Sequence, residues 1–385
     1  MKKIAVLPGD GIGPEIIAQA VRVIEKIGIV YGHKFEFAYA PVGGCAIDQC
    51  GEPYPESTHK ICCSSDAVLF GAIGDPKFDN DPTCKVRPEQ GLLKMRKDLG
   101  LYANLRPVEP FEALLDRSPL KEERIKGADL VIVRELTGGL YFGQPRGRSE
   151  KGDVAFDTCV YSKSEIIRIA EKAFELAAIR KGKVTLVDKA NVLATSRLWR
   201  ETVTELYNAK YKDMVCKATG EKLALDYLYV DNAAMQLVTA PASFDVVLTE
   251  NLFGDILSDQ ASVITGSIGL LPSASVGKEI SLYEPIHGSF PQAKGKNIAN
   301  PIATILSAAM MLEISFGMLE EGAAIRKACS EAIDNGIVTQ DLAQENGKYS
   351  STDEVGDYIL SRICSFFANM YYICTRFFEL RNYYL

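Results

Sequence analysis

Short, unbroken runs of Val, Ile and Leu recur along the chain, with helical patterns between them. The runs lie at 66–74, 128–135, 183–190 and 244–251, and residues 163–180 carry the spacing of an amphipathic helix. Strands with one solvated face alternate between apolar and polar residues, whereas strands covered on both faces read as continuous apolar runs. The sequence therefore predicts an α/β fold built on a largely buried sheet.

Length and composition set outer limits on the fold and on the partners. The chain has 385 residues, of which 47% are hydrophobic, which is enough for two domains and argues against intrinsic disorder. The formal net charge of −7 argues against nucleic acid as the main partner. The stretch 363–385 is dense in aromatic residues, but charged side chains interrupt it, so we expect no membrane span there.

The cysteines do not form an obvious metal or disulfide framework. Ten are present, none in a C-x-x-C pair, and only three histidines accompany them. The apolar run at the N-terminal end is too short for a secretory signal. We therefore expect reduced thiols, most of them buried, in a cytoplasmic protein.

Charged residues follow several of the expected strands. Arg134 closes the run at 128–135, Asp188 and Lys189 follow the run that begins at 183, and Asp231 follows another short apolar segment. Any strand must end in something polar, so a single case carries little weight. Because ligands gather at the carboxyl ends of strands in open α/β sheets, several opposite charges there indicate a site.

The loop "GDGIGPE" at 9–15 lies between a strand pattern and a helix pattern, as a dinucleotide-binding fingerprint would. Pro14, however, stands where the third glycine of that fingerprint is required. The alternative is a tight strand-to-helix turn with no role in phosphate binding. The residues alone leave both interpretations open.

Three arginines and three aspartates suggest opposite halves of one site. Arginine forks bind carboxylates in bidentate fashion, so Arg96, Arg106 and Arg134 could hold a substrate with two carboxylates, although a lone arginine is usually a surface residue. Two aspartates four positions apart share a helix face and repel each other, and a Mg²⁺ or Mn²⁺ ion would relieve that repulsion. Solvent exposure is the simpler alternative. The aspartates are Asp231, Asp255 and Asp259.

Lys189 and Tyr141 are candidate proton carriers. A lysine that is partly desolvated and near other cations has a lowered pKa and can act as a base. Tyr141 lies in the glycine-rich segment 137–147, a turn-prone stretch of the kind that often carries function. The alternative is a surface lysine and a half-buried tyrosine.

Long motifs in this chain resemble those of one family, the β-decarboxylating isocitrate and isopropylmalate dehydrogenases. They include "LPGDGIGPE", "GLLKMRKDLGLYANLRP", "RELTGGLYFG", "VDKANVL", "YVDNAAMQL", "TENLFGDILSD" and "EPIHGS", and they occur in order from residue 4 to about residue 360. The resemblance implies two α/β domains that share one broad sheet, a fold distinct from the Rossmann fold. It implies a discontinuous cofactor-binding domain at 1–101 plus 266–362, a middle domain at 102–265 with most of a homodimer interface, and an atypical tail at 363–385.

The same resemblance implies a role for each candidate residue. Arg96, Arg106 and Arg134 would bind the substrate carboxylates, and Leu92 would face an isopropyl group. Tyr141 and Lys189 would be the catalytic pair, together with Asp231, and Lys189 and Asp231 would come from the partner subunit. Asp231, Asp255 and Asp259 would bind Mg²⁺ or Mn²⁺. The implied residues on the cofactor side are Gly74, Glu89, Glu284, His287, Gly288, Ser289, Gln292 and Asn300.

The implied activity is the NAD-dependent oxidative decarboxylation of 3-isopropylmalate to 4-methyl-2-oxopentanoate and CO₂, in leucine biosynthesis. The resemblance leaves open a related enzyme acting on tartrate, malate, isocitrate or homoisocitrate. A cofactor-binding protein without turnover would be expected to lack Lys189, Tyr141 or an aspartate, and all are present. Gln292 stands where the family usually has an aspartate that binds the adenosine ribose, and Lys294 raises the question of NADP. We still expect NAD, because NADP-preferring relatives place Lys and Tyr at 292 and 293, where this chain has Gln and Ala.

Overall fold

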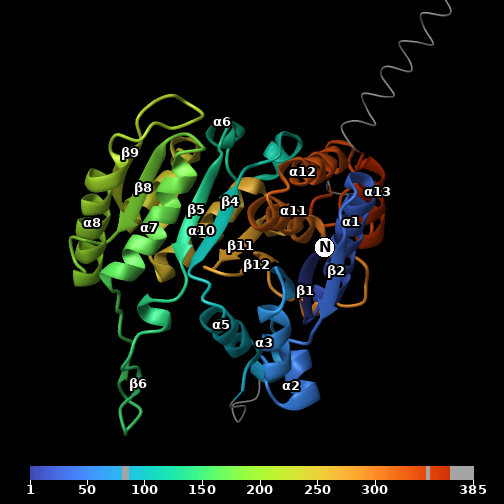
Figure 1. The fold of residues 1–385 in the computed structure, drawn as a ribbon, viewed down its shortest axis with the longest axis horizontal. Coiled ribbons are helices and arrows are strands. Elements are labelled where there is room, and N and C mark those ends of the chain that lie inside the picture. Colours follow the sequence, from blue (N-terminus) through green and yellow to red (C-terminus); the bar gives the residue numbers. More distant parts are fainter. Residues whose placement is uncertain (80–85, 344–346, 365–385) are drawn as a thin grey trace, which may run out of the picture.

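The computed structural model describes residues 1–79, 86–343 and 347–364 (Figure 1). Ten strands form its main sheet, and two more form a separate small sheet. The strands are β1 (Lys2–Gly9), β2 (Phe35–Tyr39), β3 (Ala67–Ala72), β4 (Ala103–Val108), β5 (Leu130–Glu135), β6 (Gly147–Arg148), β7 (Ala155–Phe156), β8 (Lys183–Asp188), β9 (Ala224–Tyr229), β10 (Val246–Thr249), β11 (Pro272–Val276) and β12 (Ser281–Pro285).

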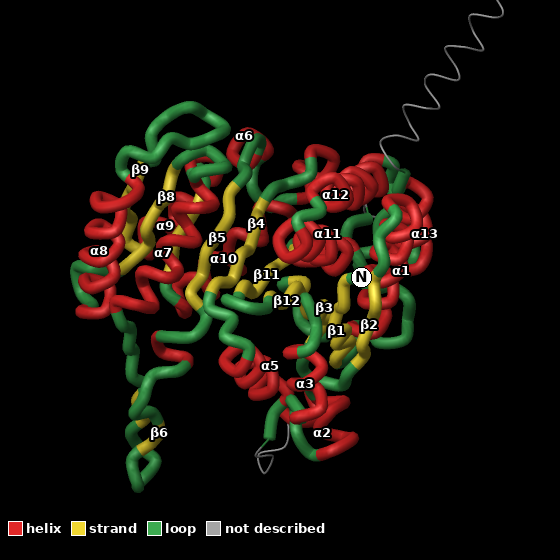
Figure 2. Tube along the Cα trace, viewed as in Figure 1, coloured by secondary structure: helices red, strands yellow, loops and turns green. Residues whose placement is uncertain are grey.

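The helices lie on both sides of the sheet (Figure 2). They are α1 (Gly13–Tyr31), α2 (Gly44–Cys50), α3 (Glu56–Cys63), α4 (Pro76–Asp79), α5 (Pro88–Asp98), α6 (Glu122–Ile125), α7 (Lys163–Ala177), α8 (Ala194–Leu206), α9 (Val230–Thr239), α10 (Asn251–Ser262), α11 (Ile302–Phe316), α12 (Leu319–Asp334) and α13 (Thr352–Arg362). Shorter helical turns are η1 (Glu112–Arg117), η2 (Gly139–Tyr141), η3 (Tyr207–Tyr211), η4 (Pro241–Ser243), η5 (Val263–Thr265), η6 (Ile268–Leu270) and η7 (Pro291–Ala293). Each of these described helices is too short or too polar to cross a membrane.

One continuous sheet runs through both halves of the molecule, as expected. The strand order is β2-β1-β3-β12-β11-β4-β5-β10-β8-β9. β11 is antiparallel to both of its neighbours, and β4 is also antiparallel to β5, whereas the remaining pairs are parallel. The sheet is therefore mixed, and β11 and β4 form its antiparallel centre.

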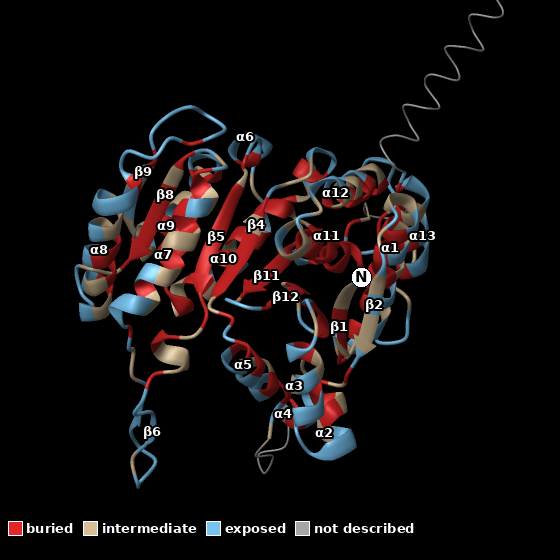
Figure 3. Cartoon of the chain, in the orientation of Figure 1, coloured by how far each residue is buried: buried red, intermediate tan, exposed pale blue. Residues whose placement is uncertain are grey.

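The predicted burial of the strands on both faces is confirmed (Figure 3). In β5, Val131 and Val133 face one hydrophobic core, with α7 and α8, and Leu130 and Ile132 face a second core, with α9 and α10. Successive side chains of a strand point to opposite faces, so each core takes every second residue. Because both faces are covered, the run of apolar residues is continuous.

The loop at 9–15 is a tight strand-to-helix turn, and its glycines are sterically required. Gly11 has φ +56°, and a Cβ there would lie 2.0 Å from the carbonyl oxygen of Ser289. The backbone nitrogen of Ile12 donates a hydrogen bond to that oxygen at 2.9 Å. The loop therefore holds the segment that contains His287 and Ser289 against α1.

One sequence expectation, the burial of the cysteines, needs correction, and another, the C-terminal tail, lies mostly outside the described residues. All eight cysteines in the described ranges are free thiols, as expected, but only Cys62, Cys216 and Cys329 are buried, so the expectation that most would be buried was wrong. Short helices and turns place the others near the surface. The predicted tail at 363–385 lies outside the described residues except for Ile363 and Cys364.

Candidate active site

The three predicted clamp arginines come together in one cavity. Arg96 comes from α5, Arg106 from β4 and Arg134 from β5, and they are only 9%, 7% and 2% exposed. All three line a cavity of about 230 Å³, which Leu92 and Tyr141 also line. The alternative of scattered surface arginines is therefore wrong.

Burial of neighbouring like charges makes this cavity receptive to an anion. Burial and the charge of Arg106 lower the pKa of Arg134 to about 10, and burial also lowers the pKa of Arg106, with a further contribution from Arg96. Glu284 offsets part of this charge, because its Oε1 accepts a hydrogen bond from Arg96 Nη2 at 3.1 Å. A dianionic ligand would relieve the remaining repulsion.

Helix α10 carries the aspartates that face these arginines. Asp255 contacts Nη1 of Arg134 and lies 3.8 Å from Nη2 of Arg106, and Asp259 Oδ1 accepts a hydrogen bond from Arg106 Nη1 at 3.1 Å. Gly254 makes this approach possible, since a Cβ there would lie 2.6 Å from Cγ of Arg134. The like charges at 255 and 259 therefore share one helix face, as predicted, and guanidinium groups lie next to both.

The ionisation of Asp255 is controlled by its neighbours. Burial alone would raise its pKa, but the charge of Arg134, the hydrogen bond from Tyr141 and the charge of Arg106 together hold the pKa below its usual value. Tyr141, in η2, donates from Oη to Asp255 Oδ2 at 2.8 Å. Burial, and then this hydrogen bond, raise the pKa of Tyr141. The tyrosine thus keeps its proton beside a carboxylate that stays ionised.

Lys189 and Asp231 form a second, separate pair. Lys189 follows β8 and Asp231 lies in the first turn of α9, after the neighbouring parallel strand β9. Lys189 Nζ donates to Asp231 Oδ1, and this hydrogen bond lowers the pKa of the aspartate. Neither residue lines the cavity with the arginines. Within the described part of the chain, no three His, Cys, Asp or Glu side chains converge on a metal position.

The predicted cofactor residues lie beside the arginine cavity. His287 and Gly288 line that cavity and also a second one, of about 540 Å³, which Asn300 and Asp341 help to form. Glu284 lies in the first cavity. A Cβ on Gly74 would lie 3.1 Å from Glu89 Oε1 and 3.4 Å from Ser289 Oγ, so these three residues are neighbours. Gln292, in η7, is exposed and lines neither cavity.

His287 provides a test of whether this region fits a dinucleotide. Its Nδ1 donates to the carbonyl of Gly288 at 3.0 Å, and its buried Nε2 has no hydrogen-bond partner among the described residues. Burial lowers the pKa of the imidazole, so the ring is neutral and Nε2 is an acceptor. A buried acceptor without a donor is costly. A cofactor hydroxyl or amide at the junction of the two cavities would satisfy it.

Several residues that shape the site were not identified from the sequence. Asn251 accepts two hydrogen bonds from Arg134, and Asn104 accepts one from Arg106 Nε at 2.7 Å. Asp341 accepts from Asn300 Nδ2 at 3.1 Å and lies in the second cavity. The spacing of Asn251, one turn before Asp255 on the same helix, is a signal that could have found it. Nothing local marks Asp341.

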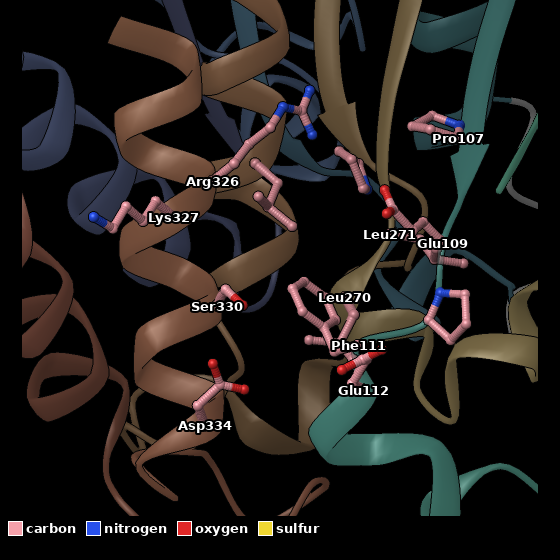
Figure 4. Close-up of a pocket in the computed structure, with 13 residues that line it drawn as sticks. Pro107, Glu109, Phe111, Glu112, Leu270, Leu271, Arg326, Lys327, Ser330 and Asp334 are labelled. Carbon is pink, nitrogen blue, oxygen red and sulfur yellow. The ribbon is translucent and has the colours of Figure 1, made fainter. Parts of the chain in front are cut away.

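A further cavity, of about 450 Å³, lies between α12 and the segment that follows β4 (Figure 4). Phe111, Leu270 and Ser330 are among its lining residues, and none of the predicted site residues is. Its one arginine, Arg326, is already held by two hydrogen bonds to Glu313, at 2.8 and 2.7 Å. This cavity is therefore not part of the site.

Known proteins resemble this chain over almost its whole length. A family model described as isocitrate/isopropylmalate dehydrogenase matches residues 3–359. The 3-isopropylmalate dehydrogenases of Bacteroides fragilis and Aquifex aeolicus are 52% and 53% identical over 361 and 363 residues, each covering 94% of this chain and 98% and 97% of those proteins. The solved isocitrate dehydrogenase from Methylococcus capsulatus aligns with a TM-score of 0.81 at 34% identity, over 95% of this chain and all of that one. A β-decarboxylating dehydrogenase from Thermococcus kodakarensis aligns with a TM-score of 0.76 at 38% identity, over 94% of this chain and 96% of that one. The chain belongs to the isocitrate/isopropylmalate dehydrogenase family.

Proposed function

We propose that the protein is an NAD-dependent 3-isopropylmalate dehydrogenase that produces 4-methyl-2-oxopentanoate and CO₂ in leucine biosynthesis. The observation that carries the proposal is the cavity in which three buried guanidinium groups, Tyr141 and Asp255 meet, with Leu92 on its wall. Relatives with this name match almost the whole chain at about half identity.

Substrate binding falls to the arginines and Leu92. Arg96, Arg106 and Arg134 bind the two carboxylates, and their forks fix the orientation of the C2–C3 bond. The isopropyl group lies against Leu92, whose apolar side chain cannot form a hydrogen bond with a charged substituent. The same arrangement explains why a dicarboxylate without the branch would bind less well.

The proton transfers are assigned to two residues. Lys189 of the partner subunit, held by Asp231 of the partner subunit, takes the proton of the substrate hydroxyl as the hydride leaves C2. After loss of CO₂, Tyr141 donates its phenolic proton to the enolate carbon, and the proton is regained from solvent. The raised pKa of Tyr141 keeps that proton in place until the enolate forms.

The cofactors are NAD and a divalent cation, Mg²⁺ or Mn²⁺. Carboxylate oxygens are the ligands that such hard ions prefer, and Asp255, Asp259 and Asp231 of the partner subunit would supply them. When bound, NAD accepts the hydride, and the cation polarises the hydroxyl and then the keto oxygen. The proposed cofactor residues are those near His287, together with Gly74 and Glu89, and Gln292 toward the ribose. His287 Nε2 would accept a hydrogen bond from the cofactor.

We infer a homodimer with shared active sites, and the separation of the two residue groups supports this inference. Lys189 and Asp231 do not line the arginine cavity, yet the chemistry needs them there. The β6/β7 hairpin projects from the body (Figure 1), and an isolated two-stranded hairpin is at best marginally stable in water. The exposed faces of α9 and α10 carry Met235 and Ile256, which are 59% and 55% exposed. We assign both features to the interface with the second copy.

We also propose two domains and a cytoplasmic location. The cofactor-binding domain comprises 1–101 plus 266–362, and the middle domain comprises 102–265. Free thiols throughout the described residues support a reducing, cytoplasmic setting. Neither a nucleic acid nor a membrane is proposed as a partner.

The first prediction concerns the activity itself. We expect the purified protein to reduce NAD when 3-isopropylmalate and Mg²⁺ are supplied, as followed by absorbance of NADH. EDTA should abolish the reaction, and excess Mg²⁺ should restore it. NADP in place of NAD should give a lower kcat/KM. Faster turnover of malate, tartrate, isocitrate or homoisocitrate under the same conditions would contradict the substrate assignment.

The second prediction concerns the isopropyl group. Leu92→Ser should lower kcat/KM for 3-isopropylmalate about 10–200-fold, because the variant loses apolar contact with the branch. The value for malate should not fall, since malate has no branch. The matched control is Leu93→Ser, on the same helix but outside the cavity lining. Equal losses on both substrates would refute this role for Leu92.

A further inference from the structure

Asn251 is a buried side chain with no assigned part in substrate, metal or cofactor binding. It is 1% exposed and begins α10, one helical turn before Asp255. Its Oδ1 accepts hydrogen bonds from Arg134 Nε and Nη2, at 3.1 and 2.8 Å. Its Nδ2 donates to the carbonyl oxygen of Gly138 at 3.1 Å. Both ends of one amide are therefore engaged, and with different elements of the site.

These contacts are part of a closed chain of interactions that includes Arg134, Asp255 and Tyr141. Gly138 leads directly into η2, which ends at Tyr141. Tyr141 Oη donates to one oxygen of Asp255, and the other oxygen of Asp255 contacts Arg134. Arg134 in turn donates its two hydrogen bonds to Asn251 Oδ1. Asn251 thus joins the two ends of a path that contains a substrate-binding arginine, a proposed metal ligand and the proposed proton donor.

The turn at Gly138 and η2, which Asn251 contacts, is closely packed against Tyr161. A Cβ on Gly138 would lie 2.5 Å from the ring of Tyr161, and one on Gly139 would lie 2.4 Å from its Oη. Tyr161 Oη in turn accepts a hydrogen bond from the backbone nitrogen of Asn251 at 2.9 Å. The turn therefore packs against the ring of Tyr161, and the hydrogen bond from Asn251 Nδ2 holds it in place.

We propose that Asn251 is a positioning residue. The two ends of its side-chain amide fix the orientations of two different groups in the site, Arg134 and Tyr141. Oδ1 orients Arg134 for a substrate carboxylate, and Nδ2 fixes the turn that places Tyr141 for proton donation. This inference rests on the proposed function. Because Arg134 serves binding and Tyr141 serves turnover, the two ends act on different kinetic constants.

Substitution of Asn251 by aspartate or by alanine distinguishes the role of Oδ1 from that of Nδ2. Asn251→Asp keeps an acceptor for Arg134 but places a carboxylate oxygen against the carbonyl of Gly138. We expect kcat to fall about 10–100-fold, with KM for 3-isopropylmalate changed by less than about threefold. Asn251→Ala removes both ends, so kcat should fall and KM should also rise about tenfold or more. Calorimetric titration of 3-isopropylmalate with Mg²⁺ should show the same loss of affinity in the alanine variant alone.

A double-mutant cycle tests whether Asn251 acts through Tyr141. The kcat of Asn251→Asp combined with Tyr141→Phe should be within about threefold of that of Tyr141→Phe alone, because the tyrosine that the amide positions is already disabled. The matched control is Asn335→Asp, at the exposed end of α12, which should leave both constants unchanged. Thermal unfolding of each variant reports folding separately.

Three results would overturn the inference. They are multiplicative losses in the cycle, an aspartate variant with wild-type kcat, and an aspartate variant whose KM rises as much as that of the alanine variant. If the alanine variant does not fold, the aspartate variant and the cycle decide. Failure of the proposed function is distinguishable, because the wild-type protein would then be inactive with 3-isopropylmalate, whereas failure of this inference leaves the wild-type protein active.

Discussion

We expect Lys189→Met to lower kcat about 10²–10⁴-fold while leaving the affinity for 3-isopropylmalate nearly unchanged. The reason is that the variant removes the amine that takes the hydroxyl proton but none of the three guanidinium groups that bind the carboxylates. Steady-state NADH formation gives kcat, and calorimetry gives the substrate affinity. Lys163→Met is the matched control and should have wild-type constants, because Lys163 is exposed and, in the part of the chain that the structure describes, forms an ion pair with Glu205.

A mixing experiment locates Lys189 relative to the arginine cavity. If each site takes Lys189 from the partner subunit, a heterodimer of Lys189→Met and Arg134→Gln chains has one site with both groups intact. Random exchange of subunits makes about half of the dimers mixed, so about a quarter of the wild-type activity should return. If both groups came from one chain, no site in the mixture would be complete. Activity that stays at the level of the separate variants would therefore rule out the shared site.

The strands buried on both faces were the most predictable part of the fold. The apolar runs at 66–74, 128–135 and 183–190 contain β3, β5 and β8, because two covered faces demand apolar side chains at every position. β11 was not predicted. Its sequence, "PSASV", carries Ser273 and Ser275, which are buried and accept hydrogen bonds from Asn104 Nδ2 at 2.7 and 3.2 Å. Those serines are acceptable in the core only because a distant residue satisfies them, and no local pattern records that.

The site was predictable where its residues are close in sequence or end neighbouring strands. Asp255 and Asp259 share a helix face by spacing alone, and Lys189 meets Asp231 because they follow the paired parallel strands β8 and β9. Asn104 is different. It supports Arg106 two residues along the same strand and reaches Ser273 on β11, a relationship set by the register between two strands far apart in the chain. Register of that kind depends on the whole sheet, so a single sequence does not reveal it.

Asp255→Asn is expected to cost more than the loss of one metal ligand. Asp255 is the nearest anion to Arg134, which is 2% exposed, and it also accepts the hydrogen bond from Tyr141. Removing one partner of a buried, hydrogen-bonded charge pair costs about 2–5 kcal/mol. At 1.4 kcal/mol per tenfold, we expect kcat/KM in Mg²⁺ to fall about 30–4,000-fold. The asparagine retains an oxygen acceptor, so the loss measures the charge rather than the shape.

Asp259→Asn is the matched comparison, because it removes the same charge from the same helix face. Its side chain is 64% exposed and, among the described residues, forms its ion pair with Arg106. Arg106 also donates hydrogen bonds to Asn104 and Ser258. The variant should therefore need more Mg²⁺ for half-maximal activity but keep its thermal stability, whereas Asp255→Asn should also unfold at a lower temperature. If the two variants lose activity and stability equally, Asp255 acts only as a metal ligand, and its assigned role in holding Arg134 and Tyr141 together is wrong.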